Sequence, residues 1–192
     1  MPALAGRILP ASNRAPSRSL GWRASLGSVT GVKIRTARPA DAEAIRAIYN
    51  AEVVGSTVTF DLVERSPAEH DEWMAQHSGA YALVVAEDGG EVIGFASVSP
   101  YRPRPAYSTT VEDSVYVAPA HRGHGVGKAL LAELVDRARM HGFHSVIARI
   151  VGNHDASIAL HRSCGFALVG TEREVGRKFG RWLDVDLMQL LL

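Results

Sequence analysis

Glycine and basic residues gather in one short stretch that could bind an anion. Residues 122–127 read RGHGVG, shortly after the apolar SVYV and directly before the helix-forming KALLAEL. Glycine permits a positive φ and lets a ligand approach the backbone closely. The first amides of a helix have no partner inside the helix, and the helix dipole favours an anion there. With Arg122 and Lys128 adding positive charge, the stretch predicts a phosphate or pyrophosphate site, against the alternative of a plain glycine-rich turn.

The two most familiar nucleotide-binding loops do not fit this stretch. A P-loop needs serine or threonine after its lysine to hold Mg²⁺, whereas Ala129 follows Lys128. A dinucleotide fingerprint needs the spacing G-x-G-x-x-G and an acidic residue at the end of the next strand. Here the glycines alternate, and the next apolar stretch ends in Val151 and Gly152. The predicted ligand is therefore a phosphate compound bound in another way.

A carboxylate and a histidine are candidates for acid–base chemistry. Glu112 lies midway along TVEDSVYV, where strand alternation places it on the same face as Tyr116. A carboxylate in an apolar strand suggests a cavity in which it acts as a base, and the alternative is an exposed strand-end acid beside Asp113. For His161, in DASIALHRSC, the residues alone favour a half-buried helix histidine with a backbone partner.

Alternating strand and helix patterns surround these residues. We expect strands over 32–38, 81–88, 91–100, 109–117, 143–152, 166–176 and 182–192, and helices over 39–53, 65–77, 125–142 and 155–164. Ser66 and Glu69 form a capping-box pattern, and Gly165 should stop the last helix. Pro100 and the prolines in the loop 101–108 should prevent both ladder pairing and helix formation in this segment. The order predicts a single α/β or α+β domain with a mixed sheet and helices on its faces.

Composition and charge limit the classes of function. A chain of 192 residues with net charge +1 suits one domain and gives no case for nucleic acid. The single cysteine, Cys164, excludes an intrachain disulfide and indicates a reducing, cytoplasmic setting. No apolar run reaches the length of about 18 residues expected of a membrane span, and the histidines show no metal spacing.

The N-terminal stretch differs from the remainder of the chain. Residues 1–31 contain arginine, serine and proline but no acidic residue. This composition favours a non-functional disordered extension over a transit peptide, and upstream sequence read from an early start codon is also compatible with it. We expect the folded domain to span residues 32–192.

The motif R-x-x-G-x-G, filled by Arg122, Gly125 and Gly127, resembles the acyl-CoA loop of the GNAT N-acetyltransferases. The stretches TVEDSVYVAPAHRGHGVGKALL, ASIALHRSCGF and VGRKFGRWLDVDLMQL are similar to those of phosphinothricin and methionine-sulfoximine acetyltransferases, and the similarity runs from about Val32 to Leu192. It implies a splayed pair of strands at the acyl-CoA site, acetyl-CoA as co-substrate, no metal, a small amino acid acceptor and a homodimer. There are two alternatives. One is acetylation of another small amine or of a protein N-terminus, and the other is a non-catalytic acyl-CoA-binding domain.

The resemblance also implies roles for individual residues. Glu112 would be the general base, and His161 would act near the CoA thiol or assist as a base. Acetyl-CoA would be bound by Val115, Tyr116, Val117, Arg122, Gly123, His124, Gly125, Val126, Gly127, Lys128, Asn153, His154 and Ser157, with the choice between Asn153 and His154 open. The acceptor would be bound by Phe60, Arg104, Tyr107 and Lys178.

Plainer interpretations stand beside these roles. Phe60 could simply pack in the core, Lys178 could lie in a solvated turn, and Arg102 is an alternative cation to Arg104. We expect direct transfer, because no cysteine or serine has a recognisable activating partner.

Overall fold

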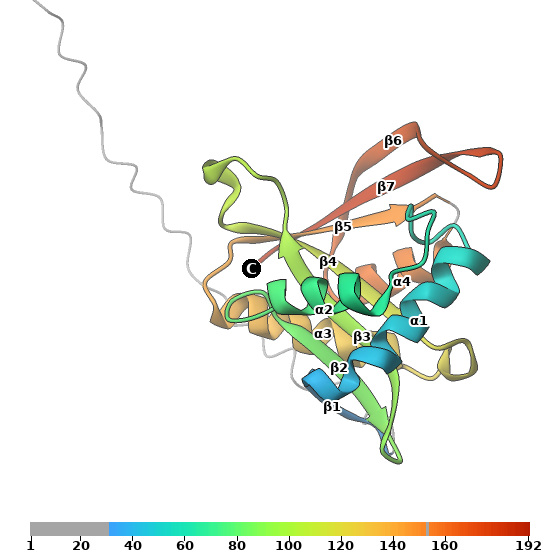
Figure 1. The fold of residues 1–192 in the computed structure, drawn as a ribbon. Helices are drawn as coiled ribbons and strands as arrows, with labels where there is room; N and C mark the ends of the chain where they lie inside the picture. The colour runs from blue at the N-terminus through green and yellow to red at the C-terminus, as the bar shows by residue number, and fades with distance from the viewer. Residues whose placement is uncertain (1–30, 153) are drawn as a thin grey trace, which may run out of the picture.

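The computed structural model describes residues 31–152 and 154–192, which form one sheet flanked by helices (Figure 1). The predicted extension therefore lies, apart from Gly31, outside the described residues, and so does Asn153. The strands are β1 (Lys33–Thr36), β2 (Leu83–Asp88), β3 (Glu91–Pro100), β4 (Thr110–Val117), β5 (Ser145–Val151), β6 (Ala167–Lys178) and β7 (Arg181–Leu191). The helices are α1 (Ala42–Gly55), α2 (Pro67–Gln76), α3 (Val126–Met140) and α4 (Asp155–Ser163).

The seven strands form a mixed sheet in the order β1-β2-β3-β4-β5-β7-β6. Neighbouring strands run antiparallel except β4 and β5, which are parallel and are joined through α3. A parallel pair needs a crossover, and a helix is its usual form. The predicted mixed sheet is confirmed.

Pairing between β4 and β5 stops partway along both strands. The ladder joins Thr110 to Ser145, Val111 to Val146 and Glu112 to Ile147. β4 nevertheless continues to Val117 and β5 to Val151, and Figure 1 shows the two strands diverging beyond the ladder. Among the described residues, the edge of β4 over 113–117 therefore has no strand partner on this side, which confirms the predicted splay.

Each face of the sheet is covered by its own apolar core. On one face α3 packs through Leu130, Leu134 and Ala138 against strand residues that include Val111 and Val146. On the other face Ile45, Tyr49 and Val53 of α1 pack with Leu83, Val85 and Phe95 of the sheet, and Trp73 of α2 joins them. Helices thus cover both faces of the sheet. This is expected when the residues on both sides of its strands are apolar and need a covering layer.

Local signals in the sequence correspond to the observed helix ends. The Ser66 hydroxyl accepts a hydrogen bond from the Glu69 amide at 3.3 Å, and the Glu69 carboxylate accepts one from the Ser66 amide at 2.8 Å. Gly165, which follows the C-cap Cys164 of α4, adopts a φ of 93°. Both predicted signals are confirmed.

The proline-rich loop differs from its prediction. Pro100 is the last residue of β3 and pairs with Val111, and Pro105–Tyr107 form one 3-10 turn. Pairing of β3 with β2 ends at Ser97, so Pro100 lies at a local edge of the sheet where a missing N–H costs little. Proline's fixed φ also suits the first position of a helical turn.

Candidate active site

A cleft of about 570 Å³ opens where β4 and β5 diverge. Its walls are the free edge of β4, the facing part of β5, the loop before α3, and the first turns of α3 and α4. Most of the residues predicted to bind acetyl-CoA line it, namely Val115, Tyr116, Val117, Arg122, Gly123, Gly125, Gly127, Lys128, His154 and Ser157. The splay and the glycine-rich loop therefore belong to one site.

The start of α3 presents amides without a side-chain cap. Gly125 occupies the N-cap position with a φ of 85°, and Gly123 has a φ of 79°, both in the left-handed region that glycine tolerates. Within the described part of the chain, no side chain accepts a hydrogen bond at this cap. The Val126 side chain is buried in the core and His124 is exposed, so Val126 can offer a ligand only its backbone. The amides of this turn remain available to an anion.

Arg122 is occupied by contacts within the protein. Its Nε donates to the Val117 carbonyl at 2.9 Å, and its guanidinium pairs with Glu52 of α1. The side chain therefore ties the loop to the end of β4 and to α1. Lys128 has no ion-pair partner within residues 31–152 and 154–192, and it is the more available cation at the cleft.

Gly127 allows α3 to begin close to two neighbouring elements. A Cβ atom at this position would lie 3.3 Å from Cδ2 of Leu160 and 3.7 Å from Cγ2 of Val117. A larger side chain would press α3 away from α4 and β4. The last glycine of the motif thus serves packing at the cleft wall rather than a positive φ.

His154 caps the start of α4. Its Nδ1 accepts a hydrogen bond from the Ser157 amide at 3.2 Å, which leaves Nε2 as the ring nitrogen that can meet a ligand in the cleft. Asn153, the other predicted candidate, lies outside the described residues.

His161 forms a buried hydrogen bond with Asp113. Its Nε2 lies 3.0 Å from Oδ2 of Asp113, and its Nδ1 lies 2.7 Å from the Ser157 carbonyl oxygen. The side chains of His161 and Asp113 are only 5% and 1% exposed, yet both residues line the cleft. A carboxylate was thus missed by sequence reasoning, which treated Asp113 only as an acid beside Glu112. Strand alternation was the available signal, since it places Asp113 on the face that α4 covers.

The pKa of His161 is set by opposing effects. Burial lowers it, whereas the hydrogen bond and charge of Asp113 and the Ser157 carbonyl raise it, and the net result lies above the ordinary value of 6.5. Burial also raises the pKa of the neighbouring thiol, Cys164, against the opposing effects of Ser163 and Lys128. A thiol with a raised pKa is a poor nucleophile, which is consistent with direct transfer.

Glu112 lies on the opposite face of β4, next to a set of charges. Burial raises the pKa of this carboxyl; Arg149 and Arg102 oppose that shift, and the nearby acids Asp113 and Glu172 add to it. Arg149 of β5 donates to the Glu172 carboxylate at 2.8 Å. The alternative interpretation, an exposed strand-end acid, does not fit a half-buried carboxyl with a raised pKa. Sequence reasoning did not identify Arg149 or Glu172.

The predicted acceptor residues divide between two regions. Phe60, 38% exposed, stands over the backbone of Gly176 on β6, so it is not simply a core residue. Lys178 is buried and donates to the Thr59 carbonyl at 2.8 Å, so the alternative of a solvated turn is wrong. Burial also lowers the pKa of this lysine.

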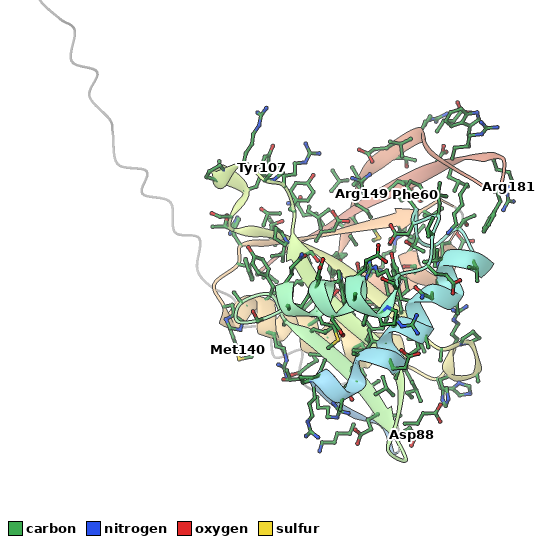
Figure 2. All side chains as sticks on the ribbon, in the orientation of Figure 1. Phe60, Asp88, Tyr107, Met140, Arg149 and Arg181 are labelled. Carbon is green, nitrogen blue, oxygen red and sulfur yellow. The ribbon has the colours of Figure 1, made fainter. Side chains whose placement is uncertain are left out.

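Arg104 and Tyr107 belong to the protruding loop between β3 and β4. Together with Arg102 and Pro103 they line a separate hollow of about 320 Å³. Figure 2 shows Tyr107 on this loop, whereas Phe60 and Arg149 lie toward the β6–β7 hairpin. The structure therefore does not bring Arg104 and Tyr107 into the main cleft.

Two other features, a metal-binding cluster and a membrane-spanning helix, are absent from the described part of the chain. Residues 31–152 and 154–192 contain no group of three histidine, cysteine or acidic side chains placed to hold a metal ion. Within the same residues no helix combines the length and hydropathy that crossing a bilayer requires.

Known proteins similar to this chain include several acetyltransferases. Residues 42–166 match the acetyltransferase (GNAT) family. The chain is 42% identical over 158 residues to a phosphinothricin N-acetyltransferase of Streptomyces coelicolor, covering 80% of this chain and 92% of the relative. It is 44% identical over 161 residues to an L-methionine sulfoximine/L-methionine sulfone acetyltransferase of Pseudomonas paraeruginosa, covering 83% and 94%.

Solved structures share the fold. A GNAT superfamily phosphinothricin acetyltransferase from Sinorhizobium meliloti in complex with AcCoA superposes with a TM-score of 0.82 at 44% identity, covering 84% of this chain and 89% of that one. A ribosomal-protein-alanine N-acetyltransferase from Brucella melitensis gives 0.82 at 42% identity, covering 83% and 99%. With this fold, this cleft and these relatives, the chain belongs to the acetyltransferase (GNAT) family.

Proposed function

We propose that the protein transfers the acetyl group of acetyl-CoA directly to the amine of a small amino acid analogue of the phosphinothricin or methionine sulfoximine type. The observation that carries the proposal is the cleft itself. An unpaired strand edge leads to an uncapped helix start on one side, and a half-buried carboxylate lies on the same strand. The acceptor class comes from two relatives named above, a phosphinothricin N-acetyltransferase and an L-methionine sulfoximine/L-methionine sulfone acetyltransferase.

The residues of the cleft fit acetyl-CoA. The amides at the start of α3 and the ammonium of Lys128 would bind the pyrophosphate. The free edge of β4, at Val115 and Val117, would pair with the amides of the pantetheine arm as an added strand does. The α4 side, with His154 and Ser157, would close over the arm. The acyl donor would thereby be held with its thioester near the point where the strands diverge.

Glu112 is the proposed general base. The amine of an amino acid is mostly protonated at neutral pH and must lose a proton before it attacks the thioester carbonyl. A carboxyl with a raised pKa accepts that proton more readily than an ordinary one. His161, on the opposite side of β4, would act near the CoA thiol or assist as a base.

The acceptor would bind beside Glu112. Arg102 and Arg149 provide positive charge there, as their effect on the Glu112 pKa shows, and an amino acid carboxylate would be attracted to either. Phe60, Arg104, Tyr107 and Lys178 remain proposed acceptor-binding residues. For Arg104 and Tyr107 this requires their loop to close over the substrate.

Acetylation of a protein N-terminus is the second candidate. The similarity to a ribosomal-protein-alanine N-acetyltransferase favours it. The buried Lys178 and the projecting 101–108 loop favour the small acceptor, because a peptide would need an open groove. A non-catalytic acyl-CoA-binding domain would have no chemical reason to keep a half-buried carboxylate beside the cleft.

A homodimer is proposed from the exposed apolar side chains near the β6–β7 hairpin. Phe179 is 57% exposed and Trp182 is 61% exposed, and Leu62 and Val63 of the loop after α1 are also exposed. A second copy of this chain would cover such a surface. Sedimentation analysis of the wild type and of a Trp182→Glu variant tests this, and a wild type that sediments as a monomer contradicts it.

The domain limits and the location follow as further proposals. A chain beginning at Val32 should fold and retain activity without the N-terminal extension. Cell fractionation should find the protein in the cytoplasm, in line with its single cysteine. Loss of activity on removing residues 1–31 would show that the extension belongs to the functional domain.

The deciding experiment is an amine panel. Purified protein is mixed with acetyl-CoA and with phosphinothricin, methionine sulfoximine, ordinary amino acids or a peptide beginning with alanine, and free thiol is followed. Turnover with the first two compounds supports the proposal, and turnover with the peptide alone supports the second candidate. Binding of acetyl-CoA without turnover of any amine would leave the acyl-CoA-binding domain as the function.

A further inference from the structure

We propose that Asp113 is a positioning residue that holds His161 as an imidazolium, so that the Asp113–His161 pair supplies the proton taken up by the departing CoA thiolate. This inference rests on the proposed function for the reaction step and on the geometry of the two side chains for the pair. It goes further than a role for His161 near the thiol. It makes His161 an acid and not a base, and it names Asp113 as the residue that keeps His161 protonated.

The two ring nitrogens of His161 both face acceptors. Nδ1 lies 2.7 Å from the carbonyl oxygen of Ser157, which can only accept a hydrogen bond, so Nδ1 carries a proton. Nε2 lies 3.0 Å from Oδ2 of Asp113, and a carboxylate also accepts. Both ring nitrogens therefore carry a proton, so the ring is an imidazolium beside a carboxylate. A histidine bound in this way is prepared to donate a proton, not to accept one.

A second buried histidine shows what burial does without a carboxylate. His70 is 1% exposed, and neither of its ring nitrogens has a hydrogen-bond partner among the described residues. Burial lowers its pKa, whereas His161, 4% exposed, has a raised pKa. Both side chains lose water. His161 has hydrogen bonds to Asp113 and to the Ser157 carbonyl that raise its pKa, whereas His70 has none in the described part of the chain and the charge of Arg65 lowers its pKa further.

The other groups around His161 do not replace Asp113. Phe166 packs edge-on at 5.1 Å between ring centroids and carries no charge. On α3, Lys128 acts on the neighbouring Cys164, and Glu112 points to the opposite face of β4. Within residues 31–152 and 154–192, Asp113 is the charged group in contact with this imidazole.

The carboxylate also has an unused oxygen. Oδ1 of Asp113 is buried without a hydrogen-bond partner in the described structure, and its residue lines the cleft. An orphaned acceptor of this kind is costly unless a ligand donor meets it. Asp113 is also the first residue of β4 beyond the ladder with β5. The pair is thus at the fork where the thioester would lie.

The proposed step balances as follows. The amine nitrogen forms a bond to the acetyl carbon, and the carbon–sulfur bond breaks with its electron pair going to sulfur. The ammonium loses two protons to Glu112 and through it to solvent. Sulfur gains one proton from the Asp113–His161 pair, which regains one from solvent. One proton is released overall for each amide formed.

The test combines NMR titration with kinetics. In protein carrying ¹⁵N-labelled histidine, His161 should be protonated at pH 7 in the wild type. In Asp113→Asn its pKa should fall by about one unit or more, while His70 titrates low in both proteins. Asp136→Asn, which removes a carboxylate from the outer side of α3, is the matched control and should change neither histidine. A wild-type His161 that is neutral at pH 7, or one whose titration is the same in Asp113→Asn, overturns the pairing.

Kinetics test the step itself. In the wild type, kcat should decline at high pH as the pair loses its proton, and in Asp113→Asn this decline should begin at lower pH. His161→Gln should reduce kcat by about 10²- to 10⁴-fold, and the double variant should lose no more than His161→Gln alone. Additive losses, or an unmoved basic limb, refute the step. If the wild type acetylates no amine while His161 titrates as expected, the proposed acceptor chemistry fails and the pairing is upheld.

Discussion

Replacing Glu112 by glutamine separates chemistry from packing at the proposed site. Glutamine keeps nearly the same shape, so no cavity forms on β4 and the three ladder pairs with β5 remain. The change removes the proton acceptor and the negative charge. The free edge of β4 over 113–117 and the start of α3 are untouched, so acetyl-CoA should bind with an unchanged Kd.

The expected loss follows from the role of a general base. Positioned bases contribute about 10²- to 10⁴-fold to a rate, which corresponds to about 3–5 kcal/mol of activation free energy at 1.36 kcal/mol per tenfold. We therefore expect kcat to fall by that factor at pH 7 in a thiol-release assay. Glu133→Gln, which breaks only the 2.8 Å pair with Arg137 on the surface of α3, is the control and should retain wild-type kcat.

The raised pKa of Glu112 adds a stability readout with a definite sign. Because the folded pKa lies above the ordinary value of 4.5, the folded state binds this proton more tightly than the unfolded state does. Ionising Glu112 therefore costs stability as pH rises through the raised pKa, and the cost is absent below pH 4.5. The glutamine variant should be more stable than the wild type at pH 7, and the difference should vanish in acid.

Two results would refute this reasoning. A glutamine variant with wild-type kcat would show that another group accepts the proton. A variant that loses activity together with acetyl-CoA affinity would show that Glu112 shapes the donor site. Isothermal titration with acetyl-CoA and urea unfolding at pH 4 and pH 7 distinguish these cases.

Three other changes have clear expected outcomes. Ser66→Ala should lower the free energy of unfolding by about 0.5–2 kcal/mol through loss of the capping box, measured by urea unfolding, with kcat unchanged. Gly127→Val should raise the KM for acetyl-CoA about tenfold or more, because its side chain must displace Leu160 and the start of α3; an unchanged KM would contradict the close approach. Asp113→Asn should destabilise the protein most at about pH 6: the folded pKa of His161 is raised, so the pair's contribution is complete below the ordinary value of 6.5 and declines as pH rises through the raised pKa. Equal destabilisation at all pH values would contradict the pairing.

Much of the fold could be predicted because its signals are local. Period-two and helical patterns lie within short windows, and the capping box at Ser66 and the glycine at position 165 mark helix ends directly. The glycine-rich loop is equally local, because φ values of 79° and 85° at Gly123 and Gly125 favour glycine whatever surrounds them. The splay was implied by resemblance, since nothing in the patterns of β4 and β5 shows where their ladder stops.

The contacts that define the site join distant parts of the chain. Asp113 and His161 are 48 residues apart, Arg122 and Glu52 are 70 apart, and Lys178 and Thr59 are 119 apart. Judged from its own helix, strand or loop alone, each of these side chains could simply lie on the surface. The partner becomes visible only when the topology places two elements together, so residue type alone suggested a solvated Lys178 and a phosphate-binding Arg122.

Strand β4 contributes to every step of the proposed mechanism, because its two faces and its edge contact different parts of the site. Glu112, the last residue paired with β5, faces the proposed acceptor side, and Asp113, the first residue beyond the ladder, faces α4 and His161. The edge that follows is free to bind the donor. Adjacent residues of a strand point to opposite sides, so the proposed base Glu112 and the carboxylate that positions His161 face away from each other. An insertion or deletion of one residue before Glu112 would reverse both assignments, and for this reason the register at the end of the β4–β5 ladder is the feature on which the proposed mechanism depends most.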